Sequence, residues 1–294
     1  MPCCLRPISS LVGLCLFVAC LWTHDAAADV TPRVAPTAAD AKWQTDFFDD
    51  FDRFEPGNWQ DQLLWVNDEQ QCYVRDGLHQ TREVSDGTLK LRVVDLGTPV
   101  ACDNLDKGGK AHPPTQYVAG RLASKNRREF VKGRWTARIR VKDSGQSGMF
   151  PAWWLLGARN NEPPVEDPDE NVCWPLVGSG EIDIFEHHSD GGPDHYAARA
   201  IKSTGVCGGG DWQALMHVQA APLADYHEYG VEWDGADLVF RLDGKEIHRS
   251  VGQGDQLPEP FFAILNFAKI NASSMTTPTW AMEVDWVKHE RAVH

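Results

Sequence analysis

The sequence lacks the patterns that predict a helical, repetitive or multidomain protein. Its 294 residues contain no convincing long amphipathic helix, no heptads and no internal repeat. No second linker long enough to divide domains follows residue 41. The apolar run from Ile8 to Trp22 is too short and poorly placed to span a membrane. These absences favour one large domain built from strands.

An excess of basic residues is also missing. Lys and Arg total 28 against 42 Asp and Glu, which gives a formal net charge of −14. Partners rich in phosphate select for Lys and Arg, so this balance argues against nucleic acid and anionic membranes as partners. It argues mildly against a strongly sulfated polysaccharide.

The first 28 residues have the pattern of a secretory signal peptide. Arg6 precedes the apolar run, and the three alanines at 26–28 supply a small-residue cleavage site. An alternative interpretation is a lipid anchor at Cys20, but Phe17 fits the first position of a lipoprotein cleavage box poorly. We therefore predict a secreted or periplasmic protein that is free of the membrane after signal cleavage.

Beyond the signal, residues 29–41 are rich in Ala, Pro and Thr and predict a flexible leader. We expect residues 42–294 to form a single domain that acts as a monomer. Four of the eight cysteines leave with the signal, and an even number in an exported chain predicts two disulfides. No cysteine pair has two-residue zinc spacing. Three pairings are possible, and we favour the two that close local loops, Cys72–Cys102 and Cys173–Cys207.

The dominant pattern that is present is a short alternating run followed by a turn residue. Many short strands with such punctuation predict an all-β fold, a two-sheet antiparallel sandwich. Asp243 and Gly244 are typical of a tight hairpin between two of the strands. The clearest runs are 88–95, 133–141, 227–234, 238–250 and 281–290.

Long loops and tryptophans point to a binding function. Residues 95–116 and 158–180 are loops of more than a dozen residues, and each carries a cysteine whose disulfide could stiffen it around a cleft. Twelve Trp residues are present. Sugar rings stack on Trp, although burial in the core explains most tryptophans in a protein of this size.

The stretch GSGEIDIFEHH (178–188) concentrates acids on a predicted strand. In a regular strand Glu181 and Asp183 share one face, whereas Glu186 points into the core, where an ionised carboxylate is costly. One extra residue, a β-bulge near Ile184 and Phe185, returns Glu186 to the face of the other acids. Neighbouring carboxylates push their pKa values apart, and glycoside hydrolysis requires one ionised and one protonated carboxyl.

This stretch resembles the Glu-x-Asp-x-x-Glu signature of glycoside hydrolase family 16, in the bulged form of the laminarinase-like branch. The resemblance implies a concanavalin-like β-jelly roll with a substrate groove on its concave sheet. Eight segments match the family in order: FFDDFD (47–52), WVNDEQQCYV (65–74), AGRLASK (119–125), GRWTARIRV (133–141), GMFPAWWLLG (148–157), HEYGVEWD (227–234), FFAILNFA (261–268) and AMEVDWVK (281–288).

The resemblance implies that Glu181 is the nucleophile, Glu186 the acid/base and Asp183 the residue that tunes both. It implies retention of configuration, which requires the two glutamates to lean toward each other over Asp183. Further positions match family residues that face or border the cleft. They are Asn67, Arg121, Trp153 or Trp154, His188 and Asn266.

No cofactor is expected for catalysis. Asp50 and Asp285 match positions at which many family members hold a structural calcium ion, although both could be ordinary acids at strand ends. Two departures from the family concern substrate choice. Phe150 stands where laminarinase-like members usually have Trp, and residues 200–202 replace a Thr-x-His motif.

The expected activity is cleavage of a β-1,3- or mixed β-1,3/1,4-glucan by a retaining endo-hydrolase. A galactan of the agar or carrageenan type is the alternative substrate, and transglycosylation is an alternative to hydrolysis. A protein of another class, a β-glucan-binding module without activity, would lack the acids at positions 181, 183 and 186 that this chain retains.

Overall fold

The computed structural model describes residues 42–212, 216–219 and 222–293. The predicted signal peptide and leader, with the alternative lipid anchor at Cys20, lie outside these residues. Within the described part, strands dominate, and the only helical elements are single 3-10 turns: η1 (Leu78–Gln80), η2 (Ser189–Gly191) and η3 (Gly254–Gln256). No helix among these residues is long and apolar enough to cross a membrane.

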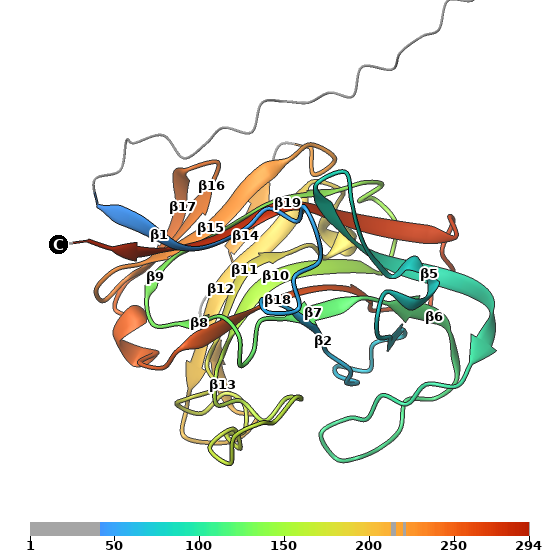
Figure 1. Cartoon of the computed structure of the whole chain (residues 1–294), viewed down its shortest axis with the longest axis horizontal. Coiled ribbons are helices and arrows are strands. Elements are labelled where there is room, and N and C mark those ends of the chain that lie inside the picture. Colours follow the sequence, from blue (N-terminus) through green and yellow to red (C-terminus); the bar gives the residue numbers. More distant parts are fainter. Residues whose placement is uncertain (1–41, 213–215, 220–221, 294) are drawn as a thin grey trace, which may run out of the picture. The chain divides into compact units, whose positions relative to one another are not determined.

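The strands form two sheets, as the sequence predicts (Figure 1). The first sheet has ten described strands in the order β17-β16-β15-β9-β19-β5-β6-β3, with β1 beside β19 and β4 beside β5. Their bounds are β1 (Trp43–Asp49), β3 (Cys72–Tyr73), β4 (Arg82–Ser85), β5 (Thr88–Val100), β6 (Thr115–Ala119), β9 (Gly133–Val141), β15 (His227–Trp233), β16 (Leu238–Leu242), β17 (Lys245–Ser250) and β19 (Thr279–Ala292).

The second sheet has nine described strands in the order β13-β12-β11-β10-β18-β7-β2, with β14 beside β12 and β8 beside β18. Their bounds are β2 (Gln60–Asp61), β7 (Arg121–Ala123), β8 (Glu129–Phe130), β10 (Met149–Gly157), β11 (Glu181–Glu186), β12 (His195–Ser203), β13 (Gly210–Trp212), β14 (Met216–Gln219) and β18 (Phe261–Lys269). Pairing is antiparallel throughout except between β3 and β6, which are parallel.

Most predicted strands are confirmed, and one loop boundary is wrong. Asp243 and Gly244 both adopt positive φ, as a tight two-residue hairpin between β16 and β17 requires. The loop predicted over 95–116 is shorter, because β5 continues to Val100 before β6 begins at Thr115. Its alternating Val, Leu and Thr residues extend the strand across the bulge-like shift in register.

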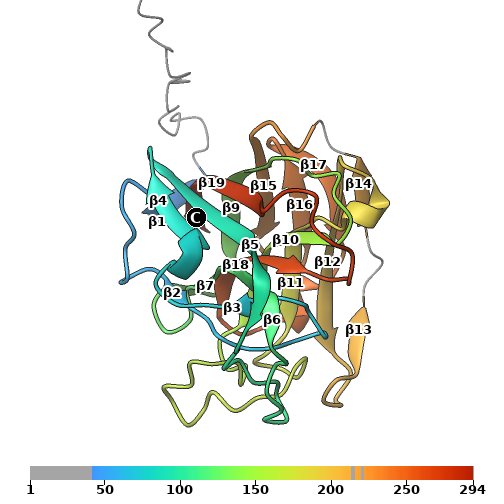
Figure 2. The same ribbon diagram turned by 90° about the vertical axis from the view of Figure 1, so that its right-hand side faces the viewer.

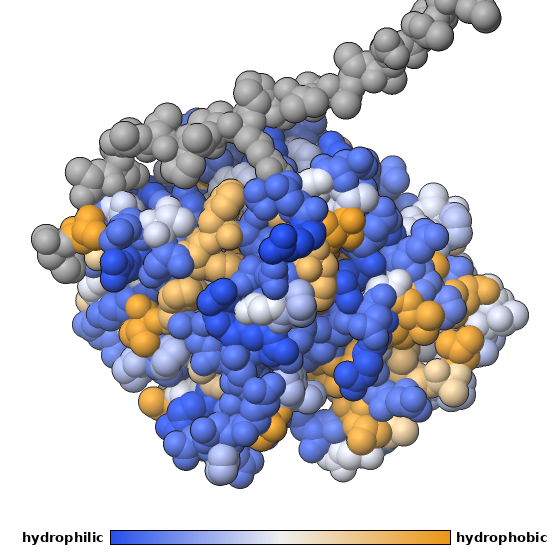
Figure 3. All heavy atoms as spheres, in the orientation of Figure 1, coloured by the Kyte–Doolittle hydropathy of each residue, from blue (hydrophilic) through white to orange (hydrophobic). Residues whose placement is uncertain are grey.

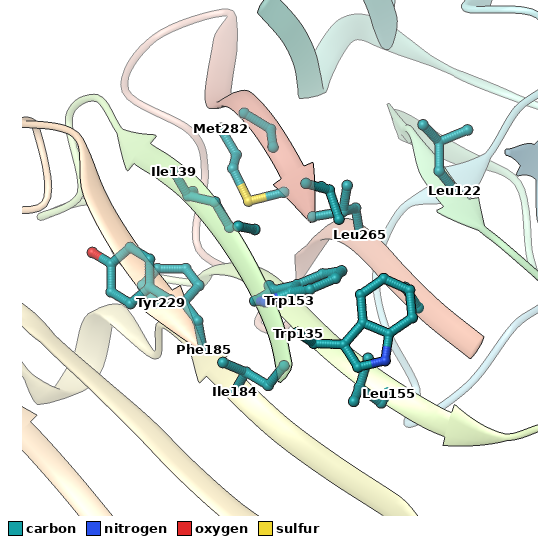
Figure 4. Close-up of a cluster of buried hydrophobic side chains, with 14 of the residues drawn as sticks. Leu122, Trp135, Ile139, Trp153, Leu155, Ile184, Phe185, Tyr229, Leu265 and Met282 are labelled. Atoms are coloured by element: carbon teal, nitrogen blue, oxygen red, sulfur yellow. The ribbon is translucent and has the colours of Figure 1, made fainter. Parts of the chain in front are cut away.

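The core lies between the sheets and explains many of the tryptophans. Trp135 of β9 and Trp153 of β10 meet edge to face with ring centroids 5.9 Å apart. Figure 4 shows these two indoles among Leu155, Ile184 and Phe185. Burying large aromatic and aliphatic side chains from both sheets fixes the sandwich and leaves the second sheet's other face free for polar residues.

Two long loops border that other face, which we call the outer face of the second sheet. Residues 158–180 contain no strand, as predicted, and reach the loop after β5 through an ion pair between Glu162 and Lys107, 4.0 Å apart. Both views place the two loops together at one end of the molecule (Figures 1 and 2). The molecular surface in the first view is mostly hydrophilic, with small scattered apolar groups (Figure 3).

Candidate active site

Strand β11 contains the bulge that the sequence predicts. Asp183 and Glu186 lie three positions apart, yet they pair with residues of β12 that are only two apart, Arg199 and Ala197. The pairing of β11 with β10 likewise passes over Ile184. One extra residue on β11 therefore resets the alternation of its side chains.

The bulge sorts the strand's side chains onto two faces. The apolar side chains all join the core between the sheets: Ile182, Ile184 and Phe185. The acids alternate with them and project to the outer face: Glu181, Asp183 and Glu186. If these same residues formed a regular strand, Glu186 would face the core, so the bulge is what brings the third acid to the others.

Asp183 lies between the two glutamates and shares hydrogen bonds with both. Asp183 is 1% exposed and Glu186 is 8% exposed. Since both glutamates reach the same carboxyl group, their side chains converge over Asp183, as the sequence predicts. We call these three residues the acid cluster.

The pKa values of the acid cluster are raised. Burial raises the pKa of Glu181 well above its ordinary value, and repulsion from Asp183 and Glu186 adds to this effect. Burial and the charge of Asp183 likewise raise the pKa of Glu186 well above its ordinary value. Burial raises the pKa of Asp183 too, although Arg199 favours its ionised form. Such a cluster can keep one carboxyl protonated beside an ionised one.

Arg199 of β12 is a member of the site that the sequence analysis missed. Its Nε donates to Asp183 Oδ2 at 2.9 Å, and its Nη2 donates to Glu186 Oε2 at 3.2 Å. Its guanidinium also lies 4.5 Å from the ring centroid of Trp212. The sequence offered one hint of this role, a single Arg in the apolar stretch AARAI (197–201). Only the register between β11 and β12 shows that Arg199 lies opposite Asp183.

The adjacent tryptophans of β10 face opposite ways. Trp153 is fully buried in the core, so its prediction as a substrate-binding residue is wrong. Trp154 pairs with Asp183 across β10 and β11 and is only partly buried, so it lies on the outer face beside the acid cluster. Successive residues of a strand alternate in direction, and therefore only one indole could reach this face.

Arg121 and Asn266 lie under Trp154. Asn266 Oδ1 accepts a hydrogen bond from Trp154 Nε1 at 2.8 Å, and the Arg121 guanidinium carbon lies 5.0 Å from the Trp154 ring centroid. Arg121 also pairs with Glu162 at 2.9 Å. Both residues are 2% exposed. They are therefore placed to hold Trp154, and almost none of their surface is exposed for the direct contact with sugar that was predicted.

A buried polar network continues beyond Trp154 and was also missed. Asn266 Nδ2 donates to the Tyr73 hydroxyl at 3.3 Å, and Tyr73 in turn donates to Glu69 Oε2 at 3.2 Å. Burial raises the pKa of Glu69 to about 7. The network links the segment around Glu69 to the site through Trp154, which no sequence spacing indicates.

Asn67 and His188 lie at the border of the site. Asn67 is exposed and adopts φ 54° in the loop before β3. His188 is exposed and packs on Phe150 with ring centroids 4.2 Å apart. His187, by contrast, is buried, and its ring contacts the carbonyl oxygens of Ser144 and His195. Sugar binding by Asn67 and His188 stays a prediction.

One of the two residues predicted to hold calcium is paired with an arginine. Asp285 Oδ2 is 2.6 Å from Arg138 Nη1, so the Asp285 carboxylate forms an ion pair with Arg138. Calcium takes about six to eight oxygen ligands. Among residues 42–212, 216–219 and 222–293, no group of three or more His, Cys, Asp and Glu is placed to hold a metal ion. Calcium binding at Asp50 and Asp285 stays a prediction.

Both favoured disulfides are confirmed. Cys72 and Cys102 are joined with their Cα atoms 5.7 Å apart, and Cys173 and Cys207 with theirs 5.5 Å apart. The second disulfide ties the long loop 158–180 to the turn between β12 and β13. It therefore fixes one border of the outer face next to the acid cluster.

A jelly-roll sandwich with a bulged Glu-x-Asp-x-x-Glu strand is a glycoside-hydrolase architecture. The chain belongs to the glycosyl hydrolases family 16, whose family model matches residues 60–290.

Two curated relatives are glucanases. The chain is 25% identical over 256 residues to the glucan endo-1,3-beta-glucosidase A1 of Niallia circulans, a match that covers 80% of this chain and 33% of that protein. It is 24% identical over 220 residues to the glucan endo-1,3-beta-glucosidase of Cryptopygus antarcticus, covering 69% of this chain and 70% of that protein. The chain thus spans only a third of the length of the first relative.

Solved structures show the same fold. The laminarinase catalytic domain of Thermotoga maritima superposes with a TM-score of 0.66 at 20% identity, covering 86% of this chain and all of that one. A structure described among the endo-acting O-glycanases that human gut microbiota express to initiate mucin breakdown has a TM-score of 0.71 at 25% identity, covering 88% of this chain and 93% of that one.

Proposed function

We propose that this chain is an exported, retaining endo-glycoside hydrolase that cleaves a β-1,3- or mixed β-1,3/1,4-linked glucan. The observation that carries the proposal is the convergence of Glu181 and Glu186 over Asp183 on the outer face of the second sheet. A structural role gives no reason to bury three neighbouring acids with raised pKa values beside a single arginine.

Glu181, in its ionised form, attacks the anomeric carbon and forms a covalent glycosyl-enzyme. The pKa values of both glutamates are raised, so the coupled cluster keeps a proton beside one carboxylate; we assign the negative charge to Glu181 and the proton to Glu186, which gives it to the leaving glycosidic oxygen. The ionised Glu186 then removes a proton from the water that releases the sugar. Asp183 hydrogen-bonds both glutamates. The ionisation of Glu181 therefore affects how tightly Glu186 holds its proton, and the reverse.

Trp154 and Arg199 complete the site from the neighbouring strands. Trp154 presents part of its indole next to Asp183, where the apolar face of a sugar ring can stack on it. Arg199 fixes the carboxyl groups of Asp183 and Glu186 through two hydrogen bonds. Its charge offsets part of the repulsion that three acids would otherwise feel.

The substrate proposal is supported by the two relatives named as glucan endo-1,3-beta-glucosidases. A galactan or a mucin-type O-glycan is the second candidate. Phe150, the absence of the Thr-x-His motif and the likeness to an O-glycanase structure favour it. Transglycosylation uses the same residues, with a sugar hydroxyl in place of water.

Export to the periplasm or medium is part of the proposal. The amino-terminal pattern of residues 1–28 supports it, as do two disulfides, which persist in oxidising compartments. We further propose a monomer. Size-exclusion chromatography with light scattering of the protein secreted by an expressing cell tests both points, because retention of residues 1–28 or a larger mass would contradict them.

The decisive experiment is a reducing-end assay over laminarin, lichenan, agarose and carrageenan with the mature protein. We expect turnover of laminarin or lichenan, with products of several sugar units because cleavage is internal. Proton NMR during the first turnovers should show the β-anomer of the new reducing end. An initial α-anomer would contradict double displacement, and turnover of agarose or carrageenan alone would establish the galactan alternative.

A further inference from the structure

Trp212 lies in the same cross-strand row as Glu181. Ile201 of β12 pairs with Glu181 on one side and with Trp212 of β13 on the other. Residues directly opposite each other in an antiparallel pair point to the same face, so Trp212 projects to the outer face with the acid cluster. Two inter-strand spacings separate it from Glu181, about 10 Å. Figure 2 shows β13 at the edge of the sheet beside β12.

The Trp212 side chain packs against two neighbouring residues yet remains exposed to solvent. The Arg199 guanidinium carbon lies 4.5 Å from its ring centroid, and Trp174 meets it edge to face at 5.5 Å. Even so, Trp212 is 53% exposed. An indole held by two neighbours loses little further freedom on binding a ligand, and its open face offers apolar area.

The segments that carry Trp174 and Trp212 are linked covalently and by a hydrogen bond. The Cys173–Cys207 disulfide joins them, and Gly208 donates its backbone N–H to the Trp174 carbonyl oxygen at 2.7 Å. Gly210 permits the close packing, because a Cβ there would lie 2.7 Å from Ile201 and 3.2 Å from Trp174. We call residues 173–175 and 207–212 the aromatic wall.

We propose that Trp212 is a sugar-stacking residue, so that the aromatic wall forms a binding subsite for the polysaccharide on the β13 side of the acid cluster. This inference rests on the proposed function. A β-linked pyranose presents axial C–H groups on its faces, which pack on an exposed indole. A chain that crosses the strands at Glu181 in the direction of the row then passes over Ile201 to Trp212.

The same row also connects the subsite to the chemistry. Trp212 covers Arg199, and Arg199 holds Asp183 and Glu186. The subsite therefore contributes mainly to binding of the substrate, because Trp212 itself touches none of the reacting atoms.

The test compares steady-state kinetics of the parent protein on laminarin with those of Trp212→Ala, Trp212→Leu and Trp212→Phe. We expect KM to rise about tenfold in the Ala and Leu variants with kcat nearly unchanged. This pattern arises when the lost contact stabilises the bound substrate and the transition state equally. Trp212→Phe should recover most of the affinity. The matched control is Phe48→Ala, which truncates an aromatic side chain, 47% exposed, on the outer face of the other sheet.

Each outcome decides the inference. If the parent turns over no polysaccharide, the proposed function fails and the inference fails with it. If the parent is active and Trp212→Leu keeps the parental KM, the inference alone is overturned. A Trp212→Leu variant that keeps KM but changes the pH profile would show that Trp212 only shields Arg199. Trp212→Leu retains apolar bulk over Arg199, so it serves if Trp212→Ala fails to fold.

Discussion

The outer faces of the two sheets both carry charged side chains, but they balance acid and base differently. On the first sheet, Glu283 Oε1 lies 2.7 Å from Lys142 Nζ, and Glu283 Oε2 lies 2.5 Å from Arg140 Nη2. On the second sheet, the acid cluster of three carboxyl groups shares Arg199. Glu283 on the first face thus has two cations, whereas the three acids of the second face share one.

The pKa values follow this balance. Burial acts to raise the pKa of Glu283, yet hydrogen bonds from Lys142 and Arg140 outweigh it and the pKa is lowered. In the acid cluster burial and mutual repulsion act together, and the pKa of Glu181 is raised. Charges paired in the way seen at Glu283 belong to an ordinary charged sheet face. An unbalanced cluster costs stability at neutral pH, which is typical of a site retained for its chemistry.

The largest expected effect is on turnover. Glu181→Gln removes the proposed nucleophile and should lower kcat by about four orders of magnitude or more, whereas the matched variant Glu283→Gln should leave kcat within about twofold. Both changes replace a carboxyl group by an amide of the same shape. Reducing-end assays on the best substrate check this, and equal activity of the two variants would refute the assignment of the site.

The next effect concerns the pH dependence of kcat/KM. Arg199 lowers the pKa values of Asp183 and Glu186, so Arg199→Ala should move both limbs of the profile to higher pH. The groups that face Arg199 are the acid cluster on β11 and Trp212 on β13. We expect kcat/KM at neutral pH to fall by about tenfold to a hundredfold.

Two variants control for this effect. Arg199→Lys keeps the charge and should retain part of the profile's position, although it cannot reproduce the forked hydrogen bonds. Arg138→Ala removes an ion-paired arginine from the first sheet and should leave the profile unchanged. A profile that does not move in Arg199→Ala would show that Arg199 contributes packing only.

A smaller effect concerns stability against pH. The folded-state pKa of Glu181 is raised above its ordinary value of 4.5, so its contribution to stability is present below that pH and is lost as the pH rises. Glu181→Gln should therefore raise the melting temperature at pH 7 and lose this advantage near pH 4. The pKa of Glu283 is lowered, so Glu283→Gln should lower the melting temperature at pH 7. Calorimetry at the two pH values checks both signs, and equal shifts in the two variants would contradict the comparison.

The smallest effect is expected for an isolated pair of the first sheet. Arg138 and Asp285 are both partly exposed, so Arg138→Ala should change the free energy of unfolding by about 1 kcal/mol or less. Urea denaturation measures it. A much larger loss would mean that the charged rows of the first sheet stabilise the fold cooperatively.

The sequence predicted those features that depend on local order along the chain. Alternation of apolar and polar residues predicted the strands, the Asp-Gly pair at 243 and 244 predicted a hairpin, and the change of parity before Glu186 predicted the bulge. Loop closure favoured the observed disulfides. Apart from the disulfides, whose cysteines are 30 and 34 positions apart, the determining contacts join residues that are close in sequence or follow a strict period.

The neighbours of the site could not be predicted in the same way. Arg199 and Trp212 reach the acid cluster only because β11, β12 and β13 adopt one particular register. Arg121 and Asn266 match family positions, yet loop 158–180 and Trp154 cover them and leave them almost no exposed area. The exposed area of a side chain depends on which residues pack over it, and the spacing of residues along the sequence does not predict this.

The sequence by itself thus determined the all-β class, the strand that carries Glu181, Asp183 and Glu186, and the extra residue that aligns them. Only the tertiary structure decided that Trp154 and not Trp153 faces the site, that Arg199 bridges two of the acids, and that Trp212 stands open beside them. The physical reason is that the alternation along a strand fixes which side chains share a face, whereas the electrostatics and exposure of a site depend on the register and packing of strands distant in sequence.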